Sequence, residues 1–521
     1  MKVTLVNPPT LYRWSHPATD AGSACCQPYF AKLLSHDNKK IGGRSTLPGE
    51  HLGLQSITAC LRKSGHEVRI VDACIEFHSS LNATLNLVLQ EHSDIIGISG
   101  PADVYGEVVW LARNLRRRGF GGWIVIGHDH ATLNDVQILE HETSIDGVLR
   151  GEAEGSMIAL VDAIGSGIGV NSVPRLTWRG PIGIVRNRSG EAINLNDLPF
   201  PSRDNTNRVL GHGMSSSIFT KRGCPYSCSF CTTGQICDAV GNKHADRWRA
   251  KSPIFAAEEF LGLVEQFSLK HLTIVDDVFV ARDAASRAWA GTFAQHLIDN
   301  GNTASFMIDC RVDSIERDLF GLLHRAGLRR VFVGVESASK VALGSYQKSY
   351  ESNSIDSAFE LLDGLAIDFI LGFIYFSPFE NIDGLKHSAR FLRTINSDDF
   401  SLHLQHMRVY SGTKLEKHLR KAGLLEGEFP FFQARFSDRR VKHVAELVRA
   451  LGRRVYELIA DFEPLDPCVS RKLFALFNDH VVELLEAKDG SDLVDAWLVD
   501  ASEKMGTWLL TTIDRCEMQC S

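Results

Sequence analysis

The sequence lacks any long apolar run. Its 521 residues contain no stretch of about 18 apolar residues, so a membrane-spanning helix is not expected. The apolar run at residues 3–6 ends at Pro8 and Pro9, which makes it too short for a signal peptide and typical of a buried first strand. No acidic or basic tail stands out. The net charge of −7 disfavours nucleic acid as a partner and leaves a cationic small substrate open.

The composition is that of an ordinary globular protein, with 44% hydrophobic and 23% charged residues. A chain of 521 residues exceeds the roughly 250–300 at which a single core stops growing, so two or three domains are expected. Twelve cysteines without a secretion signal indicate a reducing, cytoplasmic location. Cys516 and Cys520 are interpreted as neutral thiols, and ligation of a second cluster or a redox pair are the alternatives.

Three of the cysteines lie close together, in Lys221-Arg-Gly-Cys-Pro-Tyr-Ser-Cys-Ser-Phe-Cys-Thr232. Iron–sulfur cubanes are normally held by four thiolates, so a group of three indicates a cluster with one iron open to an external ligand. A zinc site completed by a distant residue, or plain structural cysteines, are the alternatives. Gly223 and Pro225 favour the cluster, because glycine permits close approach and proline stiffens the loop.

This run resembles the cluster loop of the radical S-adenosylmethionine (SAM) enzymes. The resemblance implies that Cys224, Cys228 and Cys231 ligate a catalytic [4Fe–4S] cluster whose fourth iron is chelated by SAM. In that family the reduced cluster cleaves SAM to a 5′-deoxyadenosyl radical that abstracts hydrogen from a substrate. An electron donor such as flavodoxin or ferredoxin is then implied as a partner. Phe230 is implied to lie beside the adenine, and simple loop packing is the alternative.

The first 165 residues alternate short apolar strands with helices. Strands are expected at residues 3–6, 67–71, 95–99, 123–126 and 145–149, and helices at residues 52–64, 106–118 and 156–164. This order predicts a Rossmann-like α/β domain over residues 1–165, with a parallel doubly wound sheet and ligand sites at the carboxyl ends of its strands.

Residues 1–165 also resemble the cobalamin-binding domain that precedes the radical core in one class of radical SAM enzymes. The matching pieces include Val6-Asn-Pro-Pro9, Ile96-Gly-Ile-Ser99, Gly127-His-Asp-His-Ala-Thr132 and Asp146-Gly-Val-Leu-Arg-Gly-Glu152. The resemblance implies cobalamin as a cofactor, with contacts at Pro9, Ser99, Gly127 and Glu152.

The segment departs from this family in its turns and its histidines. Gly127-His128 stands where the family has paired glycines, and an imidazole there could obstruct the nucleotide tail of cobalamin. A domain kept for stability or substrate closure is therefore the alternative. The pattern Asp-x-His-x-x-Gly, which supplies an axial histidine to cobalt in other cobalamin proteins, is absent, so no histidine is expected to replace the cofactor's own base. Four histidines are interpreted as surface or core residues: His66, His78, His128 and His130.

The rest of the chain predicts a linker, a barrel and a cap. Residues 166–210 are rich in Gly, Asn, Ser and Pro and predict a linker. Residues 211–425 repeat strand and helix six times, with strands expected at residues 217–220, 272–275, 305–310, 330–334, 369–375 and 402–409. Six such units match the (β/α)6 partial barrel of the radical SAM core, whose site residues lie at the strand carboxyl ends. Residues 426–521 predict a C-terminal helical cap, which covers the substrate pocket or packs as an appendage.

Several polar residues stand at the predicted strand ends of the barrel. One of Asp276 and Asp277 is expected to bind the SAM ammonium, with helix capping as the alternative. Arg311 is expected to bind the methionine carboxylate or to support a neighbouring aspartate. The resemblance implies that Glu336 hydrogen-bonds the ribose, and a carboxylate paired with an arginine is the alternative.

The last two strands predict substrate contacts. Alternation along a strand sends every second side chain inward. Some of four polar or aromatic residues are therefore expected to meet substrate or adenosine: Tyr375, His403, Gln405 and Tyr410.

These features predict a cytoplasmic radical SAM enzyme that functionalises an unactivated carbon of a small metabolite. Resemblance to the class favours cobalamin-dependent C-methylation in natural-product biosynthesis. The altered turn at Gly127-His128 motivates an alternative, a cobalamin-independent dehydration or deoxygenation, decarboxylation or rearrangement of a sugar-like or other small molecule. A non-catalytic iron–sulfur or cobalamin sensor is a third interpretation, against which Phe230, Glu336 and the six-strand pattern argue.

Overall fold

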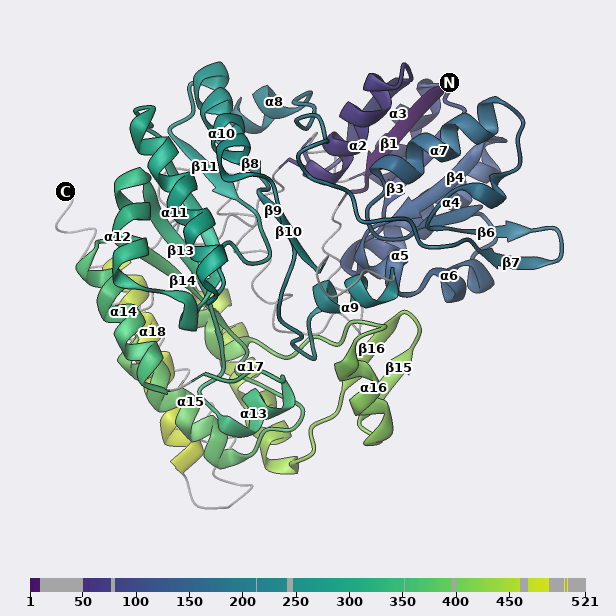
Figure 1. The fold of residues 1–521 in the computed structure, drawn as a ribbon. Coiled ribbons are helices and arrows are strands. Elements are labelled where there is room, and N and C mark those ends of the chain that lie inside the picture. Colours follow the sequence, from purple (N-terminus) through teal and green to yellow (C-terminus); the bar gives the residue numbers. More distant parts are fainter. Residues whose placement is uncertain are drawn as a thin grey trace, which may run out of the picture.

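The computed structural model describes residues 1–9, 50–75, 80–211, 213–240, 247–350, 352–395, 400–459, 467–486, 501 and 504. Two α/β bodies make up this part of the chain, one N-terminal (purple to blue) and one central (teal to green), with β9, β10 and α9 between them (Figure 1). None of the described helices is long and apolar enough to cross a membrane. Cys516, Cys520 and His78 lie outside the described residues.

The N-terminal body is built on a sheet of seven described strands in the order β2-β1-β3-β4-β5-β6-β7. Its first five members pair in parallel: β1 (Lys2–Asn7), β2 (Glu67–Asp72), β3 (Ile95–Ser99), β4 (Trp123–Gly127) and β5 (Gly147–Leu149). Its helices are α2 (Leu52–Lys63), α3 (Leu81–Gln90), α4 (Tyr105–Arg117), α5 (Asp129–Leu133), α6 (Asp135–His141) and α7 (Glu154–Gly165). This is the predicted doubly wound sheet, and the carboxyl ends of its parallel strands meet along one edge.

The segment predicted as a linker, residues 166–210, contributes to this sheet instead of only joining two domains. The strands β6 (Leu176–Gly180) and β7 (Gly183–Arg186) form an antiparallel hairpin that extends the sheet beside β5. Leu176 and Thr177 are fully buried in it, and the Asn187 side chain donates to the carbonyls of Val170 and Val173. The same Gly, Asn and Pro content serves tight turns between short strands, which is why composition alone suggested a linker.

The central body has five described parallel strands in the order β14-β13-β12-β11-β8. They are β8 (Ser216–Ile218), β11 (His271–Ile274), β12 (Ser305–Arg311), β13 (Leu328–Glu336) and β14 (Asp368–Phe373). The helices are α8 (Thr206–Gly211), α10 (Pro253–Phe267), α11 (Ala284–Asp299), α12 (Arg317–Ala326), α13 (Lys340–Ser345), α14 (Ser352–Gly364), α15 (Ile382–Thr394) and α16 (Lys414–Lys421). At the start of α10, the Ser252 hydroxyl caps the helix by accepting from the Phe255 amide.

The sixth strand, expected at residues 402–409, is much shorter than predicted. Phe400–Leu404 forms a 3₁₀ helix, η5, and one parallel bridge joins Phe376 to His406. Leu402 and Leu404 are buried in the large core that also contains α17 and α18, so packing against helices overrides the strand-like apolar run. The predicted α/β partial barrel is confirmed, with its last position held by this bridge.

The C-terminal segment is part of the barrel's own core. The strands β15 (Leu425–Glu428) and β16 (Phe431–Ala434) form a hairpin, and α17 (Arg439–Ile459) and α18 (Pro467–Glu486) follow. Helix α18 packs on α15, and both long helices contact η5. Val448 and Phe477 are fully buried in the same cluster as residues of β12 and β13. These two helices therefore stabilise the side of the barrel where the sixth strand is short.

A two-stranded ribbon leads into the cysteine loop. It pairs β9 (Lys221–Gly223) with β10 (Trp248–Ala250), and α9 (Thr232–Ala239) follows the loop. Gly223 has φ 82°, and a Cβ there would lie 1.9 Å from the carbonyl oxygen of Arg247. We expected Gly223 to admit a cluster. In the structure it admits the backbone of Arg247, in a conformation that favours glycine.

Gly223→Ala should therefore disturb the ribbon and the cysteine loop that begins beside it. The new methyl group would overlap the Arg247 carbonyl, so we expect a loss of about 1–3 kcal/mol in the free energy of unfolding. Less iron should be retained after anaerobic reconstitution. Chemical denaturation and iron analysis measure the two effects.

The matched control is Gly262→Ala on α10, where no atom lies within 4 Å of the added methyl group. This variant should gain about 0.5–1 kcal/mol, because alanine suits a helix interior better than glycine. Unchanged stability together with full iron loading in Gly223→Ala would contradict the role given to this glycine.

Candidate functional site

The cysteine loop is tied to the barrel at its middle. The amide of Ser229 donates to the carbonyl of Tyr346 at 2.9 Å, and its hydroxyl donates to the carbonyl of Ser345 at 2.6 Å. On the other side, the amide of Leu415 donates to the Ser229 carbonyl at 2.8 Å. One residue between the cysteines thus connects the loop to the end of α13 and the start of α16.

The three cysteines of the loop interact electrostatically, and their role as cluster ligands stays a prediction. Cys224, Cys228 and Cys231 are half-buried and free of disulfides. Burial raises the pKa of each thiol, that of Cys224 to about 12, and Cys231 and Cys228 contribute to the raised pKa of Cys224. The three groups are therefore close enough to interact, and each would gain from a bound cation that stabilises its thiolate. The loop provides three sulfur ligands, which leaves one iron of a cubane for another ligand.

Phe230 packs against the barrel. Its ring lies edge-on to Tyr346, with 5.3 Å between ring centroids, and belongs to a small apolar cluster around α13 and α16. This is the loop-packing interpretation. Contact with adenine stays a prediction.

The two aspartates after β11 have different surroundings. Asp276 is buried and accepts hydrogen bonds from the amides of Thr220 and Lys221, at 2.6 and 2.9 Å, and from the Thr220 hydroxyl. Burial raises its pKa, and Lys221 at 3.9 Å opposes this shift. Asp276 therefore holds the turn between β8 and β9 in place. Asp277 accepts from the hydroxyl of Thr233 on α9 at 3.0 Å, which places its carboxylate beside the cysteine loop.

Arg311 contacts the cysteine loop from the end of β12. Its guanidinium lies 4.1 Å from the ring centroid of Tyr226, a residue between Cys224 and Cys228. It also forms a two-point pair with the carboxylate of Asp313, at 3.0 and 3.1 Å. The support of Asp313 that we considered is thus present, and binding of the methionine carboxylate stays a prediction.

Glu336 ends β13 in a strained conformation. Its φ is 69°, and the register with β14 shifts between Gly334 and Glu336. Its carboxylate accepts from the ammonium of Lys348 at 3.0 Å, so the partner is a lysine where we considered an arginine. Residues other than glycine keep such backbone angles only where the surroundings impose them, and such positions cluster at functional sites. The ribose contact stays a prediction.

Two of the residues predicted to meet substrate lie in the core. Tyr375 is fully buried and its ring packs on His403, with ring centroids 5.4 Å apart. His403 is equally buried between Phe474 and Phe477 and pairs with Asn478 of α18. Strand alternation does not continue beyond β14, because the chain turns into η5, and the prediction that some members of the set meet substrate is left to Gln405 and Tyr410.

Gln405 and Tyr410 are only half-buried. The backbone of Gln405 accepts from the Phe376 amide at 2.9 Å. The Tyr410 hydroxyl interacts with Arg408, and burial raises its pKa. Arg408 in turn contacts Asp103 of the N-terminal body at 3.1 Å, so Tyr410 lies where the two bodies meet.

The predicted cobalamin residues lie at the carboxyl ends of the N-terminal strands. Pro9 is buried after β1, and the Ser99 hydroxyl contacts Nε2 of His51 at 2.7 Å. A Cβ added at Gly127 would meet only the Leu149 carbonyl, at 3.5 Å, so this strand end has open space. Glu152 accepts from Arg249 at 2.6 Å and from Arg222 at 3.3 Å, which links it to the ribbon before the cysteine loop. Cofactor contacts of these four residues stay predictions.

This edge lies against the segment that follows the cysteine loop. Helix α5 packs on α9, and the hydroxyl of Thr232, next to Cys231, contacts Asp129 at 3.5 Å. Glu154 accepts from Arg222 on β9 and from Ser56. A group bound at the strand ends would therefore lie near the cysteine loop.

Sequence reasoning missed two charged residues around the loop. Lys221 is buried with its ammonium 3.2 Å from the ring centroid of Trp289 and 4.2 Å from that of Phe279, and burial lowers its pKa to about 7. Glu154 is buried against Arg222. The only available signal was the pair Lys221-Arg222 directly before the cysteines.

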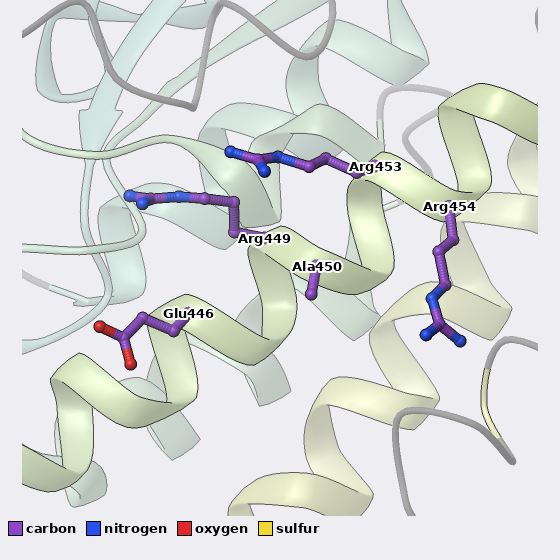
Figure 2. A pocket seen from close by; sticks show the side chains of 5 residues that line it. All are labelled: Glu446, Arg449, Ala450, Arg453 and Arg454. Carbon is purple, nitrogen blue, oxygen red and sulfur yellow. The ribbon is translucent and has the colours of Figure 1, made fainter. Parts of the chain in front are cut away.

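A groove of about 420 Å³ runs along α17. Figure 2 shows its lining residues, with Arg449 and Arg453 extended in the same direction. Arg449 lies 3.4 Å from Nε2 of His406, whose pKa is lowered to about 3 by burial and by this arginine. The groove is therefore basic, and Arg449 connects it to the bridge that ends the barrel sheet.

Comparisons with known proteins agree with this arrangement. Residues 38–161 match the B12 binding domain family. The fold resembles the cobalamin-dependent SAM radical enzyme OxsB with bound aqua-cobalamin, with a TM-score of 0.72, 17% identity and coverage of 99% of this chain and 80% of OxsB. It also resembles the radical SAM methyltransferase TsrM of Kitasatospora setae with bound cobalamin and [4Fe–4S] cluster, with a TM-score of 0.62, 16% identity and coverage of 82% and 79%.

Sequence relatives point the same way. An uncharacterised methyltransferase of Pyrococcus horikoshii is 24% identical, with 70% of this chain and 78% of the relative covered. An anaerobic magnesium-protoporphyrin IX monomethyl ester cyclase of Synechocystis is 25% identical, with 63% and 65% covered. The hopanoid C-3 methylase of Methylococcus capsulatus is 26% identical, with 62% and 61% covered.

Residues 38–161 of the chain match a B12-binding domain, and its overall fold is that of the cobalamin-dependent radical SAM enzymes. The three cofactors indicated by the sequence, a [4Fe–4S] cluster, SAM and cobalamin, are supported by the domain match and by these folds.

The two aspartates after β11 should separate a structural role from a binding role. Asp277→Asn should leave the free energy of unfolding nearly unchanged and weaken SAM binding by about 10–100-fold, the value of one charge-assisted hydrogen bond. Asp276→Asn should lower stability by about 3 kcal/mol, because it leaves Lys221 buried without its counter-charge. Equilibrium binding of SAM to the reconstituted protein and chemical denaturation provide the measurements. Equal SAM affinity in Asp277→Asn and wild type would rule out an ammonium contact at this residue.

Proposed function

We propose that this enzyme uses a 5′-deoxyadenosyl radical and cobalamin to methylate an unactivated carbon of a small molecule in a biosynthetic pathway. The observation that carries the proposal is the contact between the B12-binding domain and the cysteine loop. Helix α5, at the carboxyl edge of the N-terminal sheet, packs on α9, which begins directly after Cys231. This packing supports a reaction in which the radical site and the cobalamin site serve one substrate.

The chain's own residues would bind and orient the cofactors and the substrate, and would exclude water from them. When bound, the reduced cluster and SAM supply the radical, and cobalamin supplies the methyl carrier. Asp277 and Glu336 place carboxylates at the ends of two barrel strands. The Asp277 carboxylate would accept a charge-assisted hydrogen bond from the SAM ammonium, and that of Glu336 would accept from the ribose hydroxyls. Phe230 and Tyr346 form an apolar wall beside the loop. An electron donor such as flavodoxin or ferredoxin would provide the electron.

Contacts between the two bodies would hold the substrate space together. Beyond the barrel's last bridge, Arg408 pairs with Asp103, and the Ser411 hydroxyl donates to the Asn134 side chain at 2.6 Å. Tyr410 lies between these two links. We propose that Tyr410 and Gln405 face the substrate, since they are the half-buried members of the predicted set.

A second candidate is a radical ring closure or rearrangement by the same site. One relative is named a magnesium-protoporphyrin IX monomethyl ester cyclase. In both candidates the radical is the same, and they differ in whether a methyl group reaches the product. The substrate class, a small organic metabolite, is shared.

Anaerobic reconstitution with iron, sulfide, cobalamin and SAM carrying a deuterated methyl group tests the proposal. Candidate substrates are screened first for those that raise deoxyadenosine formation. With such a substrate, we expect a product that contains the three deuterium atoms of the methyl group. Cys228→Ala should form neither deoxyadenosine nor product, because two thiolates do not hold a cubane in this loop.

The outcomes separate the candidates. Deoxyadenosine with an unmethylated product would overturn methylation and favour ring closure or rearrangement. A protein that retains no cobalamin after reconstitution would exclude cobalamin-dependent methylation.

A further inference from the structure

His128 has a backbone conformation that is almost restricted to glycine. Its φ and ψ are 86° and −179°, directly after Gly127 at the end of β4. A residue with a side chain costs about 1–3 kcal/mol in such a region and persists there only when its surroundings impose it. The strain places the imidazole at the carboxyl edge of the sheet, where ligands of doubly wound domains bind.

The ring is oriented by the next residue. Nδ1 of His128 lies 2.5 Å from a carboxylate oxygen of Asp129, and the same carboxylate oxygen accepts from the His130 amide at 2.7 Å. Since a carboxylate only accepts, the proton of the neutral ring lies on Nδ1 and the lone pair lies on Nε2. This carboxylate–histidine arrangement is the one that fixes the tautomer of metal-binding histidines and raises their basicity.

The other histidines at this edge have their rings engaged elsewhere. His51 accepts from the Leu54 amide at Nδ1 and contacts the Ser99 hydroxyl at Nε2, so both of its nitrogens are used. His130 is 3% exposed and its ring stacks on Phe429, so its Nε2, at which no hydrogen bond is found in the described part of the chain, is buried away from the strand-end surface. The side chain of His128 is 40% exposed, and within the described part of the chain no hydrogen bond is found at its Nε2.

We propose that Nε2 of His128 is an axial ligand of the cobalt of cobalamin, with Asp129 as its positioning residue. This inference rests on the proposed function, because it requires bound cobalamin. Nε2 contributes its lone pair to cobalt and displaces water or the cofactor's own benzimidazole base. The Nδ1 proton stays between His128 and Asp129, and no electron is transferred. Neutral imidazole nitrogen is an established ligand type for first-row transition metals. The proposal reverses our expectation that no histidine replaces the base.

Electron paramagnetic resonance of the cob(II)alamin form tests the ligand directly, without turnover. The coupling of the unpaired electron to one axial ¹⁴N gives a triplet pattern, and coupling to ¹⁵N gives a doublet. Protein labelled with ¹⁵N-histidine and loaded with unlabelled cobalamin should show the doublet. In His128→Gly this coupling to protein nitrogen should be lost, and the variant should fold because glycine suits the backbone.

Two further variants sharpen the test. His141→Ala, which removes an exposed histidine of α6, should keep the doublet. Asp129→Asn should weaken cobalamin binding by about 10–100-fold, as loss of the group that orients a metal-binding histidine does elsewhere. Unchanged affinity in that variant would contradict the positioning role of Asp129.

The two proposals fail in different ways. If labelled protein retains cobalamin but shows a triplet from the cofactor's own base, or no nitrogen coupling, the axial-ligand inference is overturned and the proposed function stands. If the protein retains no cobalamin, the proposed function fails, and the inference fails with it.

Discussion

The structure depends on charged contacts between the N-terminal body and the ribbon that carries the cysteine loop. Glu152 and Glu154, which follow β5, meet Arg222 of β9 and Arg249 of β10. The Glu154 and Arg222 side chains are only 5% and 19% exposed, so both charges have lost much of their water. Buried pairs of this kind add little net stability, but they tolerate few alternative geometries because an unpaired buried charge is costly. They set the distance between the sheet edge and the cysteines.

A second set of contacts fixes the loop within the barrel. The Asp276 carboxylate accepts hydrogen bonds from the backbone amides of Thr220 and Lys221. The Lys221 ammonium lies between this carboxylate and the rings of Trp289 and Phe279. Cation–π contact and a weak ion pair compensate for the buried ammonium. The ribbon is thus held by the N-terminal body on one side and by β11 on the other.

Two of the seven described residues other than glycine with positive φ lie at the carboxyl ends of strands. Glu336 and His128 have positive φ values of 69° and 86°, and neither is a glycine. Each has an oriented polar side chain, one paired with Lys348 and the other with Asp129. Tyr375 and His403 differ from them, because these two were predicted from strand alternation and lie in core positions without positive φ.

Much of the arrangement could be predicted from the sequence because it depends on local spacing. Residues close together along the chain are enough to recognise the group of three cysteines and the alternation of strands and helices in both bodies. They are also enough to predict the helix start at Ser252 and Pro253. The short strands β6 and β7, the replacement of the sixth strand by η5 and the core position of His403 could not be predicted. In each case burial against an element distant in sequence decided the outcome. The hairpin of β6 and β7 pairs with β5, whereas η5 and His403 pack against α17 and α18.

The sequence by itself determined the order of a cobalamin-type domain before a barrel and predicted the ligand set, Cys224, Cys228 and Cys231, since both are patterns of residue type and spacing. Only the tertiary structure decided which polar residues at the strand ends are used in structural contacts. Asp276 and Asp277 are adjacent in sequence, yet one is buried beneath the ribbon and the other reaches α9. The difference arises because successive side chains at a strand end point to opposite sides, and the partners on each side come from distant parts of the chain.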